Sequence, residues 1–449
     1  MILYRFLILC CFGALLFTST IQAKEWQLSP KGDLQAQLDL ASSGDVIKLS
    51  PGRYLGNFVI NKPVTLVGQP GAVIDAGGQG HAILLQASDI TLEHLKIVNW
   101  GDDLTEENSG IYSVTQATNL TVKNNVLEGD GFGIWLHKAK QVKVIGNKVK
   151  GNTKLRSADR GNGIQISSIE NGHIFNNETS EVRDGIYVIA SKNNIIEGNT
   201  MHDLRYGIHY MYSYDNSVIN NYAYNTRAGY ALMSSRRLTI AGNKTVNSED
   251  YGFLLNYITR STFKDNHIEK VWTKPENKVL GRDGKGLFVY NSAYNTIVGN
   301  LVDTTEIGIH LTAGSEETKV YGNSFLNNPT QVKYVSNKKQ EWSKDGRGNY
   351  WSNYLGWDMN NDNVGDVVFE PNDGIDKLVW QYPEMKMIMD SPAVIILRWV
   401  QRQFPVLKPP GVKDSFPLMS SPHQASESAT SSEMPAMASV NNGQPGVVH

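Results

Sequence analysis

The chain has 449 residues, with 42 basic and 44 acidic side chains and a formal net charge of −2. No basic block stands out from this balance, so the composition disfavours a nucleic-acid partner. Forty-one glycines and many asparagines indicate a turn-rich β architecture rather than disorder, because the apolar residues remain periodic.

Residues 1–23 have the pattern of a secretory signal peptide. Arg5 precedes an apolar run over residues 6–17, and Ala23 is a small residue suited to the cleavage position. The run is far shorter than the ~20 residues that a membrane span needs. Because Cys10 and Cys11 are the only cysteines, the mature chain is expected to have no disulfides and no thiolate metal ligands. The sequence therefore predicts an exported, soluble protein.

The start of the mature chain is predicted to cap a β architecture. Segment 28–41 can form one short amphipathic helix, with Leu34, Leu38 and Ala41 as its apolar positions. Solenoid ends require such a cap. Short strands separated by Pro-Gly and Gly-Gly turns follow, and these indicate early, less regular coils.

A unit of about 22 residues then recurs, in which a glycine opens each repeat and an asparagine follows 14 or 15 residues later. A fixed period of this size is typical of a solenoid. The glycines are Gly110, Gly133, Gly163, Gly185, Gly207, Gly229, Gly252, Gly286 and Gly308. The asparagines are Asn125, Asn147, Asn177, Asn199, Asn221, Asn243, Asn266, Asn300 and Asn323.

The residues within the unit indicate which solenoid it is. After each glycine the chain alternates with strand periodicity, as in Gly-Ile-Tyr-Val-Ile from Gly185. The residue before each asparagine is Gly, Asn or Asp, the types that tolerate a left-handed backbone. Stacked asparagines can pair their amides between neighbouring coils. The sequence therefore predicts an all-β fold, a right-handed parallel β-helix with a short N-terminal capping helix and a C-terminal cap and extension.

Strand alternation predicts which side chains face outward. The first and third positions after each glycine are apolar and should point inward, so the second and fourth should point outward. This outer face is aromatic and sulfur-bearing, which predicts an exposed binding surface. Its second positions are Tyr112, Trp135, Gln165, Tyr187, His209, Ala231, Leu254, Phe288 and His310. Its fourth positions are Val114, His137, Ser167, Ile189, Met211, Met233, Asn256, Tyr290 and Thr312.

Two longer gaps in the repeat place loops 154–160 and 272–283 on the same arc of the coil, as two walls. Between them lie His209, Met211 and Met233. The methionines occupy equivalent positions one coil apart, about 5 Å from one another, and His209 is two residues before Met211 on the same face. Imidazole with two thioethers suits Cu(I). The sequence predicts a transient copper site here; the alternative is that these residues pack on the surrounding aromatics.

Arginines also recur, since Arg183, Arg205 and Arg227 each lie two residues before a glycine. Neighbouring like charges at this spacing repel by about 1 kcal/mol even in water. Two sources of compensation remain open, namely internal carboxylates and a bound acidic surface or ligand. The internal candidates are Asp184, Glu197 and Asp203.

Beyond Asn323 the repeat degrades, and the sequence predicts residues 24–345 as the β-helix and 346–419 as a cap and docking extension. Asp358, Asn360, Asp362 and Asp366 resemble a calcium loop without the Gly and Glu of an EF-hand, so a looser Ca²⁺ site and an Asx-rich turn both remain open. Segment 392–419, with a short apolar run, is predicted to dock on a membrane partner. Residues 420–449 are low-complexity and predicted to be disordered.

Three segments resemble a known family. They are PGRYLGNFVINKPVTLVGQPGAVIDAGG, NYWSNYLGWDMNNDNVGD and SPAVIILRWVQRQFPVLKPPGVKDSFPLM, with the glycine and asparagine repeats between them. Together they resemble the NosD family, periplasmic maturation proteins of nitrous oxide reductase, from the signal to about Met419. The resemblance implies a non-enzymatic protein, peripheral to the membrane, that acts with an ABC transporter permease and its ATPase. It also implies assembly of the copper sites of nitrous oxide reductase, with copper received from a small chaperone.

The rival function is a lyase or epimerase, or a binding protein, for acidic polysaccharide, which an arginine stack and an aromatic face would suit. Such chemistry needs a general base and charge stabilisation at the sugar carboxylate, and hydrolysis needs two carboxylates on one face. The outward positions hold no Asp or Glu, and no D-P-H-D sequence occurs. The sequence therefore favours a protein that is not an enzyme.

Overall fold

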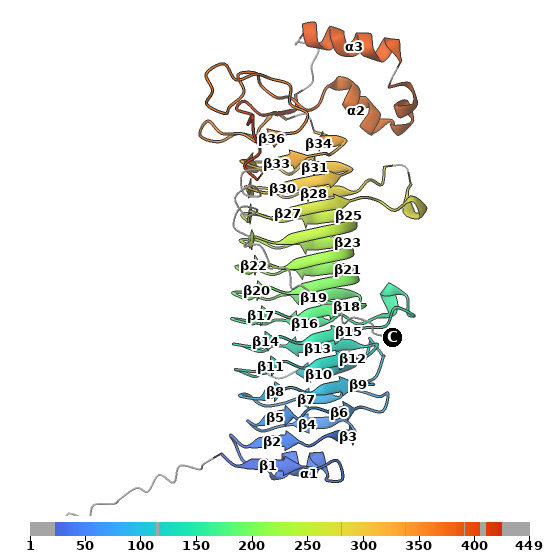
Figure 1. Ribbon diagram of the computed structural model, residues 1–449, viewed down its shortest axis with the longest axis vertical. Helices are drawn as coiled ribbons and strands as arrows, with labels where there is room; N and C mark the ends of the chain where they lie inside the picture. The colour runs from blue at the N-terminus through green and yellow to red at the C-terminus, as the bar shows by residue number, and fades with distance from the viewer. Residues whose placement is uncertain are drawn as a thin grey trace, which may run out of the picture.

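The computed structural model describes residues 23–113, 116–279, 281–336, 338–389, 391–404 and 410–423. The predicted signal up to residue 22 and residues 424–449 of the predicted disordered tail lie outside this part of the chain. The described residues form a right-handed parallel β-helix with a helix at its N-terminal end and two at its C-terminal end (Figure 1). The predicted fold class is confirmed.

Two parallel sheets run the length of the solenoid, and each coil contributes strands to both. One sheet contains β1 (Glu25–Leu28), β2 (Val46–Leu49), β5 (Thr65–Gly68), β8 (Thr91–Glu93), β11 (Thr121–Lys123), β14 (Lys143–Ile145), β17 (His173–Phe175), β20 (Ile195–Glu197), β22 (Ser217–Ile219), β24 (Thr239–Ala241), β26 (Thr262–Lys264), β29 (Thr296–Val298) and β32 (Lys319–Tyr321). The other contains β3 (Gly52–Leu55), β4 (Phe58–Ile60), β6 (Ala72–Asp75), β7 (Ile83–Leu85), β9 (Lys96–Val98), β10 (Ser109–Ser113), β12 (Val126–Glu128), β13 (Phe132–His137), β15 (Lys148–Lys150), β16 (Ile164–Ser167), β18 (Glu178–Ser180), β19 (Asp184–Ile189), β21 (Thr200–Met211), β23 (Tyr222–Met233), β25 (Lys244–Asn256), β27 (His267–Val271), β28 (Lys285–Tyr290), β30 (Leu301–Thr305), β31 (Ile307–Leu311), β33 (Ser324–Leu326), β34 (Thr330–Tyr334) and β36 (Tyr350–Trp351).

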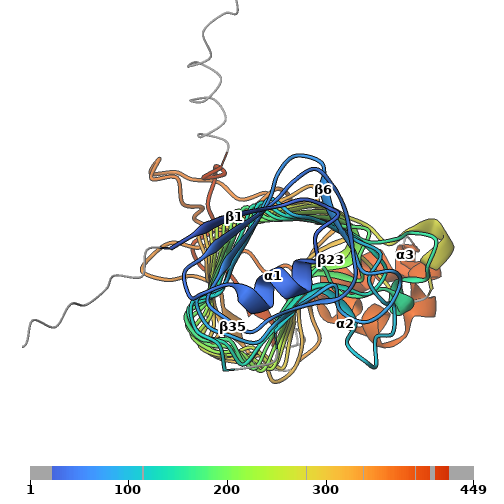
Figure 2. The same ribbon diagram turned by 90° about the horizontal axis from the view of Figure 1, so that it is seen from below.

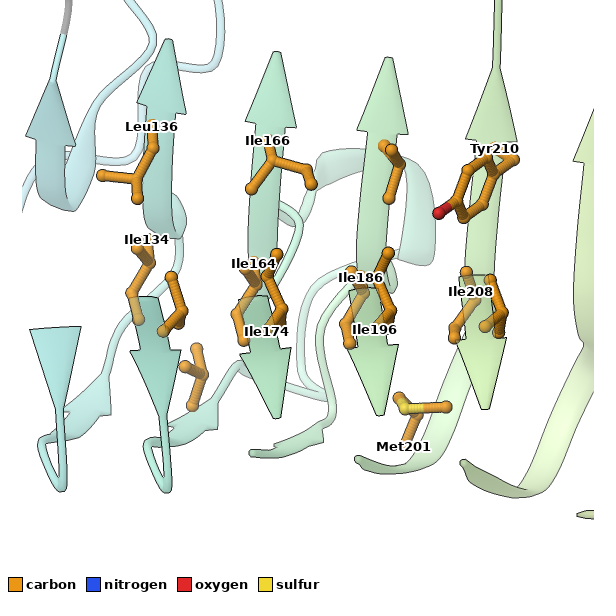
Figure 3. Close-up of a cluster of buried hydrophobic side chains, with 14 of the residues drawn as sticks. Ile134, Leu136, Ile164, Ile166, Ile174, Ile186, Ile196, Met201, Ile208 and Tyr210 are labelled. Carbon is orange, nitrogen blue, oxygen red and sulfur yellow. The ribbon is translucent and has the colours of Figure 1, made fainter. Parts of the chain in front are cut away.

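The core fills the inside of the coils with the residues at the first and third positions after each glycine. Ile186 pairs in register with Ile208, and Ile208 with Tyr230, so one coil stacks on the next without a slip. Ile208 is fully buried in this column, and Tyr210 is fully buried in the neighbouring third-position column (Figure 3). Glycine opens these strands because a Cβ at Gly207 would collide with the carbonyl oxygen of Gly229 in the next coil. The predicted alternation is confirmed on the inner side.

The predicted asparagine ladder is present. The amide of Asn199 donates to Asn221 Oδ1 at 2.9 Å, and that of Asn221 donates to Asn243 Oδ1 at 2.9 Å. The same pairing runs from Asn125 to Asn349. The preceding residues have the predicted left-handed backbone, for example Asn220 with φ 54° and Gly242 with φ 64°.

The N-terminal opening is closed by α1 (Leu34–Leu40), which lies across the first coils when the molecule is seen from below (Figure 2). Its apolar residues Leu34 and Leu38 are buried, as is Ala41. The helix is shorter than the predicted segment 28–41. It begins at residue 34 because Asp33 is its N-cap, accepting the N–H of Ala36 at 3.0 Å, while residues 25–28 pair as β1.

The C-terminal end is closed by residues that return from far along the chain. Short strands β35 (Gln340–Glu341) and β37 (Val412–Lys413) pair in parallel. Asp414 is fully buried and accepts the N–H of Asn349 at 2.8 Å and the indole N–H of Trp351 at 2.9 Å. Ser421 is buried at the same end. The division predicted at residue 345 stays a prediction, but residues 412–421 pack on the last coils and do not extend from them.

A helical unit projects beyond this cap, formed by α2 (Gly374–Gln381), the 3-10 helix η3 (Pro383–Ile388) and α3 (Pro392–Gln403). Arg398 of α3 pairs with Asp376 at 2.8 Å and with Asp373, and Val394 is buried beside them. The other face of α3 exposes Ile395, Ile396 and Trp399. No helix within the described residues is long and apolar enough to cross a membrane.

Candidate metal centre on the outer strand face

The second-position residues lie outside the main core, as predicted, but most are not exposed. Tyr112 and Trp135 form a separate apolar cluster with Phe132, and Leu84 and Leu104 pack on it. His209, Ala231 and Leu254 are buried as well. The predicted broad exposed aromatic surface is therefore wrong for this row, because long neighbouring side chains cover one another. Exposed aromatics occur instead at the fourth position and the adjoining turn, at Tyr212, Tyr257, Tyr290 and Tyr294.

The two methionines lie side by side on neighbouring coils. Met211 ends β21 and Met233 ends β23, and the two residues are register partners. Both residues are half-buried. The hydroxyl of Tyr187 donates to the Met211 sulfur at 3.2 Å, which fixes one methionine from the preceding coil. Asn256 follows in the same row, and its buried Oδ1 has no hydrogen-bond donor within the described residues.

His209 is held by a buried carboxylate. Its Nδ1 lies 2.9 Å from Asp184 Oδ2, and the Asp184 side chain is fully buried. Arg205 donates to both oxygens of Asp184, at 2.8 and 2.7 Å. Burial raises the pKa of Asp184, but the hydrogen bonds from His209 and Arg205 outweigh it and lower that pKa from its ordinary value. Asp184 is therefore an anion that accepts from Nδ1–H of His209.

The second ring nitrogen of His209 is one of several buried polar atoms in this region that have no partner within the described chain. His209 is 9% exposed, and its Nε2 is buried with no hydrogen-bond partner among the described residues. A buried polar atom without a partner needs an explanation. Histidines that bind metals commonly donate their other ring N–H to a carboxylate, as Nδ1 of His209 does here. A metal ion at Nε2 would satisfy this atom, and the neighbouring thioethers would make it a soft one.

The predicted walls are two loops beside the corners of the coils. Loop 152–160 contains the 3-10 helix η1 (Ser157–Asp159), and loop 272–283 contains η2 (Pro275–Asn277). Both project from the same side of the solenoid (Figure 1). They line a groove of about 770 Å³ whose floor is made by the corners of β21, β23 and β25. The two loops therefore lie on one side of the solenoid as predicted, but none of the predicted metal ligands lines the groove between them.

Internal carboxylates, one of the two predicted alternatives, compensate two of the three arginines in the row. Arg205 pairs with Asp184, one of the three expected partners. Arg227 pairs with Asp250 at 2.5 Å, a partner that sequence reasoning missed. Arg183 donates to Asn162 Oδ1 at 3.3 Å. Glu197 and Asp203 lie instead near histidines, Glu197 at 3.6 Å from His173 and Asp203 at 2.7 Å from His202.

The calcium-like segment forms an Asx-rich turn. Asp358 accepts the N–H groups of Asp362 at 3.2 Å and Asn363 at 2.8 Å, and Asp366 accepts that of Met359 at 2.8 Å. The side-chain oxygens thus satisfy main-chain donors of the turn. Across the described residues, no group of three or more His, Cys, Asp or Glu side chains is arranged to hold a metal ion. Methionine sulfur is not among these side chains, so the predicted ligand set of His209, Met211 and Met233 stays a prediction.

The fold defines the class of protein, a right-handed parallel β-helix. The family model described as "Periplasmic copper-binding protein (NosD)" matches residues 145–356, and the "Right handed beta helix region" model matches residues 71–171. A family 28 exopolygalacturonase of Yersinia enterocolitica has the same fold, with a TM-score of 0.50 at 12% identity over 72% of this chain and 77% of that chain. At this identity the likeness shows the fold alone.

The chain belongs to the NosD family. It is 52% identical to a "Probable ABC transporter binding protein NosD" of Stutzerimonas stutzeri, over 84% of this chain and 87% of the relative. It is also 52% identical to the protein of the same name in Pseudomonas aeruginosa, over 86% of this chain and 91% of the relative. These relatives are named binding proteins and not enzymes, in agreement with the absence of carboxylates from the outward positions.

Proposed function

We propose that this protein binds copper transiently as Cu(I) through His209, Met211 and Met233. In this role it serves assembly of the copper sites of nitrous oxide reductase in the periplasm, with copper received from a small chaperone. It acts together with a membrane ABC transporter, made of a permease and an ATPase. Copper is the cargo of the protein under this proposal, and not a structural part of it.

The buried, unpartnered Nε2 of His209 carries the proposal. Asp184 holds the opposite ring nitrogen and so leaves the Nε2 lone pair available. Met211 and Met233 lie on the same face, two residues further along β21 and on its neighbour β23. Imidazole and thioether ligands favour Cu(I) over Cu(II), and three neutral ligands without a thiolate suit a carrier that must release its cargo.

The test is Cu(I) titration against a competing chelator under anaerobic conditions. Met211→Leu and Met233→Leu keep apolar bulk and lose the sulfur, so each is expected to weaken binding about tenfold or more while the melting temperature holds. The matched control is Met201→Leu, because Met201 lies on β21 but is fully buried inside the coil. Unchanged affinity in both outer variants would return these methionines to a packing role.

The transporter is proposed to meet the C-terminal end. Of the docking segment predicted at 392–419, we propose that only α3 contacts the transporter. Asp414 and Leu418 instead form hydrogen bonds and a β-bridge with the last coil. Ile395, Ile396 and Trp399 of α3 are each 60% exposed, which is unusual for side chains of this size. α2 lies on the same side as the wall loops, since Val379 and Trp380 line a cavity of about 300 Å³ with Trp272 and Lys278. The groove and the helical unit thus lie on one side of the molecule.

A further inference from the structure

The groove between the wall loops has a chemical character that metal binding does not require. Its floor holds the corner residues of three coils, 203–205, 225–227 and 247–249, and its walls include residues 157–160 and 272–274. Its lining has four cationic and two acidic side chains, a net charge of +2. The cations are Arg160, Arg205, Arg227 and Lys274, and the acids are Asp203 and Glu249.

The acidic side chains of the groove are already engaged, whereas two of its cations, Arg160 and Lys274, have no carboxylate partner among the described residues. Asp203 accepts from Asn225 at 3.1 Å and lies 2.7 Å from a His202 nitrogen, and Glu249 pairs with Arg282 at 3.4 Å. Arg160 donates to main-chain carbonyls, among them Leu155 at 2.6 Å, and within the described chain has no carboxylate partner. The groove therefore presents positive charge beside the indole of Trp272, a combination typical of protein interfaces.

Arg205 connects this groove to the metal site. Its guanidinium lines the groove, and 31% of the side chain is exposed. The guanidinium donates two hydrogen bonds to the carboxylate of Asp184, from Nε to Oδ1 at 2.8 Å and from Nη2 to Oδ2 at 2.7 Å. The same Asp184 oxygen that accepts from Arg205 Nη2 also lies 2.9 Å from Nδ1 of His209. A second route passes through Tyr206, whose ring lies under the guanidinium at 4.4 Å and meets the His209 ring edge-on at 5.2 Å.

We propose that the groove binds an acidic segment of a partner protein, and that its occupancy raises the affinity of His209 for metal through Arg205 and Asp184. The second half of this proposal rests on the proposed copper site. Carboxylates of the acidic segment compete with Asp184 for the guanidinium of Arg205. The negative charge of Asp184 is then less neutralised by Arg205, so it attracts positive charge at His209 more strongly. A cation at Nε2 is then favoured. By linkage, the metal-loaded protein binds the acidic segment more tightly by the same factor.

The experiment uses the metal-free protein and a hexaglutamate peptide, with NMR signals of the Trp272 indole N–H and the His209 ring as readouts. Trp272 lines the groove and donates its N–H to Thr304 O at 2.8 Å, so its signal reports occupancy. Both signals are expected to move with one dissociation constant, and hexaglutamine should move neither. Hexagalacturonate is the competing probe. Binding of this sugar alone would overturn the assignment to a protein partner.

Two variants separate binding from coupling. Arg160→Gln combined with Lys274→Gln changes the groove without touching Asp184 or His209, and should abolish peptide binding while leaving the His209 signals of the free protein unchanged. Arg205→Lys keeps the charge and loses the two-pronged hydrogen bond, so the peptide should still move Trp272 but no longer His209. In wild type, saturating peptide should raise Cu(I) affinity about fivefold or more.

The two proposals fail in different ways. Peptide binding that moves Trp272 but not His209 in wild type overturns the coupling, and absence of binding overturns the groove assignment. A coupled response in the metal-free protein, with no Cu(I) bound in the chelator titration, supports the groove and its relay while it overturns the copper site.

Discussion

The repeated coils and the C-terminal cap solve the same problem by different means. In the coils, each buried asparagine finds its partner at the same position of the next coil, as Asn221 does with Asn199 and Asn243. At Asn349 there is no next coil. Its N–H and its side-chain amide both donate hydrogen bonds to Asp414, a residue 65 positions further along the chain. A repeat supplies its own partners, whereas its end must bring one from a distance.

The difference also separates what the two regions present to other molecules. The coils are consistent from one to the next in their inner rows and vary in the outer row, where His209 has no counterpart in either neighbouring coil. The cap closes the stack and then carries α2 and α3 beyond it (Figure 1). Regular positions therefore hold the solenoid together, and departures from regularity are the sites to test for function.

The largest effect is expected from a break in the middle of the ladder. Asn221→Leu would leave the buried Asn199 N–H without its acceptor and would remove the amide that donates to the Ile196 main-chain oxygen. It would also take one acceptor from the Asn199 amide and one of the two donors from Asn243 Oδ1, whose other donor is the main-chain N–H of residue 221. Orphaned buried groups cost about 1–3 kcal/mol each, so we expect a loss of about 3–5 kcal/mol. Urea unfolding followed by circular dichroism measures it. The control is Thr239→Val, which changes an exposed side chain of a neighbouring coil; similar losses in both variants would contradict the role of the ladder.

A smaller, pH-dependent effect is expected at the cap. Burial raises the pKa of Asp414 from its ordinary value of 3.8 to about 6, against the hydrogen bonds from Trp351 and Asn349. Between these values the folded chain keeps a proton that the unfolded chain has released. The free energy of unfolding contributed by Asp414 therefore falls as pH rises from about 4 to about 6, by at most about 3 kcal/mol.

Asp414→Asn removes this titration, so the stability difference between wild type and variant should change across that pH window. Urea unfolding at steps between pH 4 and pH 7 measures the difference. Asp345→Asn is the matched control, since Asp345 is exposed at the same end of the molecule and should leave the pH profile unchanged. Parallel profiles for wild type and Asp414→Asn would show that Asp414 does not titrate in this range.

The sequence predicts the features that follow the repeat, and it does not predict the contacts made outside the repeat. A period of about 22 residues places the glycines, the asparagines and the two methionines in register, so the coil, the ladder and the Met211–Met233 pair were all predictable. Asp184 could be named only as one of three partners for the arginines, because spacing does not show that it also holds His209.

Contacts outside the repeat were not predictable from its spacing. The return of Asp414 to Asn349 has no periodic signal, and burial of the outer row depends on how neighbouring side chains lie over one another. Met385 and Met387 illustrate the same limit. They alternate in sequence as on a strand, but the structure has them in the 3-10 helix η3.

The smallest effect on stability, and the most specific effect on function, is expected from the exposed face of α3. Ile395→Ser combined with Trp399→Ser removes two large apolar side chains that face away from the buried Val394, so the melting temperature should stay within about 2 °C of wild type. If this face meets the transporter, the variant should no longer copurify with the permease from detergent-solubilised membranes.

Leu55→Ser is the control, because Leu55 is an equally exposed apolar residue near the opposite end of the solenoid. Arg398 stays in place, so its pairing with Asp373 and Asp376 keeps α3 on α2. Undiminished copurification of the α3 variant would move the docking surface to another part of the molecule.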